Sequence, residues 1–123
     1  MRFAKIGSGL YVLWGLLHVA AAYDEFILGA GQSGLVQGKL YQGAWNLLFF
    51  ALAAIVIAVK YNWYNSRLGY WLNLIIISVA DIGFVIFVFI PGHVTLFPAI
   101  LGPVLWLSGG IFTTLGIRAK ATD

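Results

Sequence analysis

Two ionisable side chains lie inside long apolar stretches of the sequence, where a charge is costly. Asp81 stands between the apolar runs 74–77 and 84–87, and His18 lies within the apolar stretch 6–28. Ionisable groups at membrane depth usually face protein or a water-filled cavity, and they often mark functional sites. An imidazole and a carboxylate that pair are far less costly in lipid than an isolated carboxylate. Because such a pair can exchange a proton, we predict Asp81 and His18 as catalytic acid and base.

Polar and small residues repeat at helical spacing around this pair, so each helix has one face suited to point inward. With a rise of about 1.5 Å per residue, we expect His18 and Asp81 to lie within about 3 Å of each other in depth. An indole N–H at this depth also needs a hydrogen-bond partner. The residues that we predict to bind a substrate share these faces: Asn46, Gln42, Trp106, Trp14, Trp45 and Glu25.

The composition indicates the surroundings in which these residues must be placed. Of the 123 residues, 62% are hydrophobic and 9% are charged, whereas a soluble domain carries roughly 25% charged residues. Four apolar stretches, at about 6–28, 39–59, 68–90 and 96–117, each approach the roughly 20 residues that cross a bilayer as a helix. The connections between them are short. We therefore predict an all-α integral membrane protein, an antiparallel bundle of four transmembrane helices in a single membrane domain, 1–123.

The basic residues predict the direction of insertion. Six of the seven fall on one side of the predicted membrane, namely Arg2, Lys5, Lys60, Arg67, Arg118 and Lys120. The positive-inside rule then places both termini in the cytoplasm, and we expect a multi-pass location in a bacterial inner membrane. The net charge of +3 is thus a topology signal, and we expect no nucleic-acid partner. The stretch 6–28 also resembles a signal peptide, but its length, Trp14 and His18 favour a retained helix.

Several kinds of chemistry find no support in the sequence. It has no cysteine, which excludes disulfides, thiolate catalysis and thiolate metal sites. It has no glycine fingerprint for dinucleotides and no nucleophile elbow. His18 and His93 differ in predicted depth by about 15–20 Å, too far to share one haem iron. Metal binding by His18, Asp81 and Glu25 matches no recognised ligand spacing, so we expect no metal and no cofactor.

These observations favour a small intramembrane enzyme that uses the Asp/His pair on a lipophilic substrate, of the isomerase, cyclase or hydratase type. Two other functions fit the same composition. One is an accessory or assembly subunit of a larger membrane complex. The other is a small proton-coupled transporter that acts as an oligomer, because four helices enclose little pathway. The expected partners are the lipid bilayer, a lipophilic small molecule, and a homo-oligomer or larger membrane complex.

Overall fold

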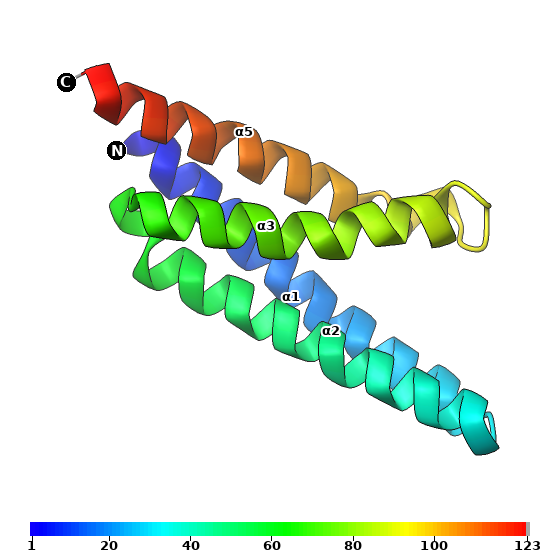
Figure 1. The fold of residues 1–123 in the computed structure, drawn as a ribbon. Helices are drawn as coiled ribbons and strands as arrows, with labels where there is room; N and C mark the ends of the chain where they lie inside the picture. Colours follow the sequence, from blue (N-terminus) through cyan, green and yellow to red (C-terminus); the bar gives the residue numbers. More distant parts are fainter. Residues whose placement is uncertain (123) are drawn as a thin grey trace.

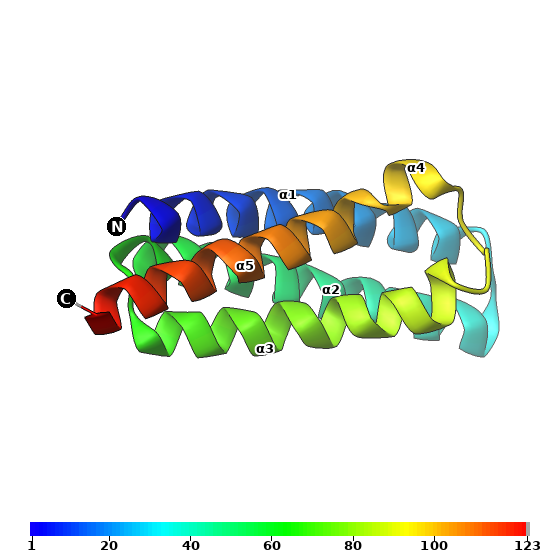
Figure 2. The same ribbon diagram turned by 90° about the horizontal axis from the view of Figure 1, so that it is seen from above.

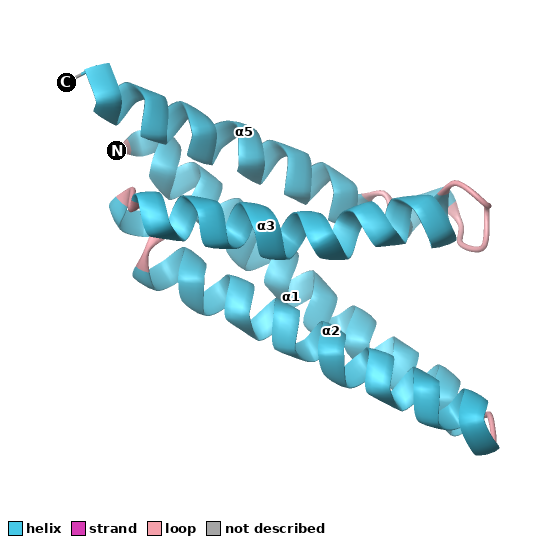
Figure 3. Ribbon diagram, viewed as in Figure 1, coloured by secondary structure: helices cyan, strands magenta, loops and turns pink. Residues whose placement is uncertain are grey.

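Four long helices make up most of the computed structural model, which describes residues 1–122 (Figure 1). Three shorter helical elements lie between them, and the described residues contain no strand (Figure 3). In chain order the elements are α1 (Arg2–Ala30), α2 (Gly34–Lys60), the 3-10 helix Asn62–Tyr64, α3 (Arg67–Phe84), the π-helical turn Val85–Phe89, α4 (Leu96–Ala99) and α5 (Leu101–Thr122).

The four long segments are long and apolar enough to span a membrane, namely Arg2–Ala30, Gly34–Tyr64, Arg67–Phe89 and Leu96–Thr122. The prediction of an all-helical chain with four such helices is therefore confirmed. The predicted fourth stretch, 96–117, is broken near its start, where Phe97 has extended backbone angles (φ −110°, ψ 133°). The cause is Pro98, because a residue that precedes proline is disfavoured in the α conformation.

The helices form two hairpins that meet at one end and separate at the other. The α1–α2 pair diverges from the α3–α5 pair toward the two loops that are farthest from the termini (Figure 1). Seen from above, the same helices lie roughly parallel, and both termini lie at the end where the hairpins meet (Figure 2). Helix α1 packs against both α2 and α5, and α3 packs against the same two helices.

The terminal end is closely packed around aromatic and small residues. Tyr11 and Trp14 of α1 are fully buried there, together with Ala54, Ala58 and Ile77. Gly109 of α5 lies against the Tyr11 ring, so that a Cβ at this position would be 2.6 Å from Tyr11 Cδ1. A glycine is therefore required for α5 to approach α1 this closely, as is common between membrane helices.

Side-chain hydrogen bonds join the helices at the same end. In four of these bonds, a side-chain amide or hydroxyl group donates to a backbone carbonyl of another helix or to the oxygen of a second side-chain amide. They run from Ser8 Oγ to the Ala58 carbonyl (2.8 Å), from Asn73 Nδ2 to the Ala54 carbonyl (3.0 Å) and to Asn62 Oδ1 (2.8 Å), and from Asn65 Nδ2 to the Gly116 carbonyl (2.8 Å). These bonds hold the hairpins together where the chain begins and ends, and leave the opposite end to separate.

Candidate functional site

A cavity of about 930 Å³ lies between the hairpins in the half of the molecule where they separate. We call this cavity the cleft. Its lining comes from α1, α2, α3, the π-helical turn, α5 and the segment 94–99. Most of the lining is apolar, including Leu17, Leu47, Phe50, Phe84 and Val88. The polar lining side chains are His18, Asp24, Glu25, Asn46 and Thr95. An apolar cavity with a few polar groups is the usual form of a small-molecule site.

His18 forms part of the cleft wall, and each of its ring nitrogens faces an oxygen atom. Its Nδ1 lies 2.7 Å from the backbone carbonyl of Trp14, one helical turn earlier. A carbonyl can only accept, so Nδ1 carries a hydrogen and donates it. The other nitrogen, Nε2, lies 3.5 Å from Asp81 Oδ1. The backbone of α1 thus fixes the tautomer and directs Nε2 at the carboxyl group of α3.

The contact between Nε2 and Oδ1 favours some protonation states of the two residues over others. A lone pair on Nε2 cannot face an ionised carboxylate favourably, because both groups are acceptors. A single proton on either atom removes this repulsion, in a neutral imidazole with a carboxylic acid or in an imidazolium with a carboxylate. Both forms are neutral overall, which is the least costly charge state for a buried pair. We call these two residues the His18–Asp81 pair.

Trp14 supports both members of the pair. Its Nε1–H donates to Asp81 Oδ2 at 3.0 Å, and its indole stacks on the His18 ring with a centroid distance of 3.9 Å. Asp81 is completely buried, and its second oxygen, Oδ1, has no hydrogen-bond partner among the described residues. His18 Nε2 approaches that oxygen to 3.5 Å, which is beyond the usual range of roughly 2.7–3.2 Å. Asp81 is therefore firmly held through Oδ2 and loosely through Oδ1.

Gly102 of α5 covers the pair on the side of the cleft. A Cβ at this position would lie 3.2 Å from His18 Cε1, 3.5 Å from His18 Nε2 and 3.7 Å from Asp81 Oδ1. Gly102 and His18 both line the cleft, whereas Asp81 does not. The absence of a side chain at residue 102 leaves the Nε2 edge of His18 close to the cleft, with Asp81 behind it.

The structure brings together some of the predicted site residues and separates others. The predicted pairing of His18 with Asp81 is confirmed as a contact, and Asn46 and Glu25 line the cleft. Trp14 lies behind the cleft wall, where it is bonded to Asp81. The assignment of catalysis to the pair, and of substrate binding to the other residues, stays a prediction.

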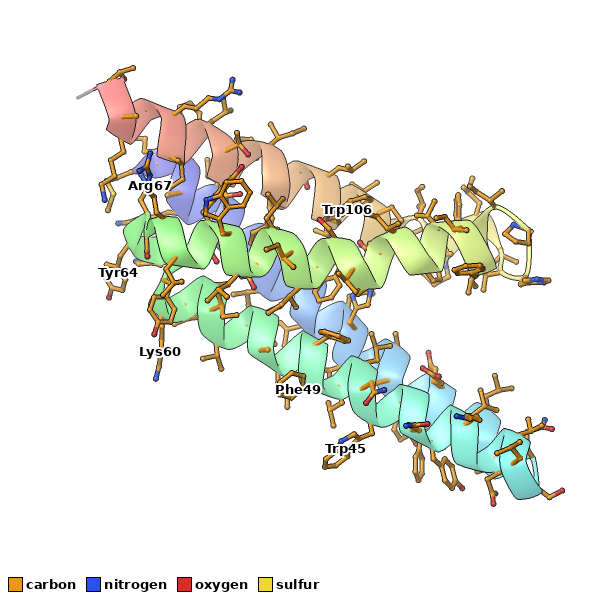
Figure 4. The ribbon with its side chains drawn as sticks, viewed as in Figure 1. Trp45, Phe49, Lys60, Tyr64, Arg67 and Trp106 are labelled. Carbon is orange, nitrogen blue, oxygen red and sulfur yellow. The ribbon has the colours of Figure 1, made fainter. Side chains whose placement is uncertain are left out.

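Besides Trp14, three predicted binding residues lie outside the cleft lining. Gln42 is exposed. Trp45 is 73% exposed. Its side chain and that of Phe49 lie on the side of α2 that is turned away from α3 (Figure 4). Trp106 points instead at α3, where its Nε1–H donates to Ser78 Oγ at 2.9 Å. The indole thus has the partner that its depth required, but this partner is a serine that was not among the predicted site residues.

The lining of α2 consists of Gly43, Asn46, Leu47 and Phe50. Their spacing of three, four and seven residues describes one helix face. That face begins one residue after Gln42, so it includes the predicted Asn46 but neither Gln42 nor Trp45. Gly43 provides space for the Glu25 side chain, because a Cβ at residue 43 would overlap the Glu25 carboxylate. The glycine therefore lets the Glu25 side chain lie against α2 at the edge of the cleft.

Within residues 1–122 no group of three or more His, Asp or Glu side chains is placed to hold a metal ion. Comparisons with protein-family models, with curated proteins and with solved structures found no significant match. Fold and site together define the class, an all-helical chain whose four long helices can span a membrane, with a cleft bordered by a His–Asp pair. The proposal for the function of the cleft therefore uses the positions of its lining residues.

Proposed function

We propose that this protein is an intramembrane enzyme that binds a lipophilic molecule in the cleft and transfers protons to and from it at His18. The observation that carries the proposal is that His18, in contact with the fully buried Asp81, forms part of the wall of an apolar cleft. Enzymes that move protons need a positioned acid or base within reach of the substrate and shielded from bulk water. The cleft supplies the shielding and the His18–Asp81 pair supplies the proton.

The proposal includes insertion in a membrane with both termini in the cytoplasm. Lys60 and Arg67 lie at the end of the molecule that holds the termini (Figure 4), and Arg2, Lys5 and Lys120 belong to the same end by their positions in α1 and α5. The positive-inside bias supports this direction, and a bacterial inner membrane stays the expected location. The cleft then opens in the outer half of the bilayer.

Isomerisation is the reaction that needs the fewest additional parts. The pair gives the proton of Nε2 to one carbon of a substrate double bond, and the electron pair of that bond forms the new C–H bond. The other carbon of the former double bond now carries the positive charge. The next carbon along the chain gives a proton to Nε2, and the electrons of that C–H bond form the shifted double bond. The pair ends as it began, so no oxidant, reductant or second substrate is consumed. The positive charge that develops on the substrate is stabilised by the Asp81 carboxylate left behind.

The surrounding residues have positioning roles in this scheme. Trp14 holds Asp81 by its Nε1–H and His18 by stacking. The Trp14 carbonyl keeps the hydrogen on Nδ1, so Nε2 is the nitrogen that exchanges its proton. Asn46 supplies an amide from α2 to the cleft lining. Gly102 allows α5 to pack closely beside the His18 ring.

Deuterium incorporation tests the proposal whatever the identity of the substrate. Membranes that contain the protein are incubated in D₂O, and the lipids are extracted and analysed by mass spectrometry. We expect carbon-bound deuterium in one lipophilic species with the unchanged protein, and its loss with Asp81→Asn and with His18→Phe. His93→Phe is the matched control, because His93 is exposed in the loop and does not line the cleft.

The alternatives give different results in the same experiment. An accessory subunit leaves the deuterium content of every lipid unchanged by either substitution. A proton-coupled transporter likewise labels no carbon, but His18→Phe abolishes its pH-dependent uptake in vesicles. Absence of carbon-bound deuterium in all lipids would refute the proposal that this protein is such an enzyme.

A further inference from the structure

The polar groups at the edge of the cleft carry one sign of charge. Asp24 and Glu25 both belong to its lining, and the lining contains no Lys or Arg within the described part of the chain. The only salt bridge among residues 1–122 is the one between His18 and Asp81, so neither of these two acids has a basic partner there. The cleft is therefore apolar along its walls, neutral at the His18–Asp81 pair and anionic at one edge.

The Glu25 carboxylate is directed into this space by the packing of two helices. It lies against α2 at Gly43, where any side chain would overlap it. Glu25 is half-buried, and no hydrogen bond to its side chain is found among the described residues. An anionic group beside an apolar cavity, in a region of low dielectric constant, attracts a cation much more strongly than it does in water.

The carboxyl group of Asp81 lies behind the cleft wall and does not contribute to this anionic edge, since Asp81 is not part of the lining. Its Oδ1 is fully buried and lies 3.5 Å from His18 Nε2. The cleft thus presents carboxylates at the edge formed by Asp24 and Glu25, and no Lys or Arg of the described lining faces them. A ligand that brings positive charge supplies what this arrangement lacks.

From these observations we infer that the natural ligand of the cleft is a cationic amphiphile, a molecule with an apolar chain or ring system and a protonated amine. The inference rests on the proposed function, because it concerns the same cleft. The ammonium group lies between Asp24 and Glu25, and the apolar part lies along Leu47, Phe50 and Phe84. Residues 18 and 25 are seven residues apart on α1, or about 10 Å at helical rise. The carbon on which His18 acts is therefore about 10 Å from the amine.

Photolabelling tests the charge of the ligand directly. The purified full-length protein in phosphatidylcholine nanodiscs is irradiated with a diazirine derivative of dodecylamine and, separately, with the matching derivative of dodecanol. Labelled peptides are then mapped by mass spectrometry. We expect the amine to label cleft residues at least about ten-fold more than the alcohol does, since hydrogen bonds to a charged group are stronger than those between neutral groups. Glu25→Gln should remove this preference.

Two further variants keep the test decisive. Gly43→Ala leaves every charge in place but displaces the Glu25 carboxylate from α2, and we expect the preference for the amine to fall with it. Lys39→Gln is the control, because Lys39 is exposed at the same end of α2 and does not line the cleft. It changes the local charge by one unit, and we expect it to leave the preference unchanged.

The outcomes separate this inference from the proposed function. Equal labelling of the cleft by the amine and the alcohol, unaffected by Glu25→Gln, would overturn the cationic ligand and leave a lipophilic site. A change of equal size but opposite sign with Lys39→Gln, which removes a positive charge, would also overturn it, because the effect of Glu25→Gln would then be long-range electrostatics. Labelling of the outer helix faces alone, by both probes, would remove the cleft as a binding site and the proposed function with it. Asp81→Asn should leave the amine preference intact.

Discussion

Replacement of Asp81 by Asn and by Leu separates the hydrogen bonds of the buried carboxyl group from its proton. The Asn amide can satisfy every bond at this position. Its oxygen can accept from Trp14 Nε1, now 3.0 Å from Asp81 Oδ2, and its NH₂ can donate to the lone pair of His18 Nε2. Leu has a similar shape but offers neither group. We expect Asn to keep the fold and remove the exchangeable proton, and Leu to remove both.

The expected size of the effect follows from the two contacts. Hydrogen bonds between membrane helices contribute about 0.6–2 kcal/mol each. Leu at residue 81 leaves the Trp14 N–H without an acceptor and His18 Nε2 without a donor, so it should lower the free energy of unfolding by about 1–3 kcal/mol. Asn should lower it by less than about 0.5 kcal/mol, since it replaces both bonds.

Reversible unfolding in mixed detergent micelles measures these differences, and deuterium incorporation measures the chemistry on the same samples. Two results would refute the reasoning. If Asn costs as much stability as Leu, the charge of the carboxylate is required and the pair is a fixed ion pair. If Leu costs no more than Asn, the bonds to Trp14 and His18 contribute nothing to the fold.

Three other substitutions have defined expectations. Gly102→Ala places a methyl group 3.2 Å from His18 Cε1, so we expect a loss of about 1 kcal/mol in unfolding experiments and a clear fall in deuterium incorporation. Asn73→Leu breaks hydrogen bonds of 3.0 and 2.8 Å and should lower the free energy of unfolding by about 1–3 kcal/mol. Trp45→Ala, at a 73% exposed position, is its control and should lower the same free energy by less than about 0.5 kcal/mol. Trp106→Phe loses one bond of 2.9 Å, so its unfolding free energy should fall by about 1 kcal/mol with unchanged deuterium incorporation.

The sequence was sufficient to predict the four helices and the contact between His18 and Asp81. The helices follow from the length of the apolar stretches. The contact follows from the cost of an ionisable group at membrane depth, which leaves Asp81 few possible surroundings, and from the similar depth of one histidine on another helix. These are strong constraints that do not depend on how the helices are rotated.

The rotation of α2 and the separation of the hairpins were not predictable in the same way. A membrane helix is apolar on every side, so its sequence specifies weakly which side faces the other helices. The prediction therefore grouped Gln42 and Trp45 with Asn46, whereas the structure places only Asn46 of these three in the cleft lining, beside Gly43. The cleft itself depends on close contacts at the distant terminal end, such as that of Gly109 with Tyr11, which no local pattern reveals.

A neutral His18–Asp81 pair, in the membrane location that we propose, has a consequence for the response to membrane voltage. Moving one elementary charge across the whole membrane involves about 2.3 kcal/mol per 100 mV. In the pair, the proton moves between atoms 3.5 Å apart, a small part of a hydrocarbon core of about 30 Å, and it leaves no net charge behind. The voltage therefore changes the proton's energy by less than about 0.3 kcal/mol per 100 mV. The proposed proton transfer should therefore run at the same rate in energised and de-energised vesicles.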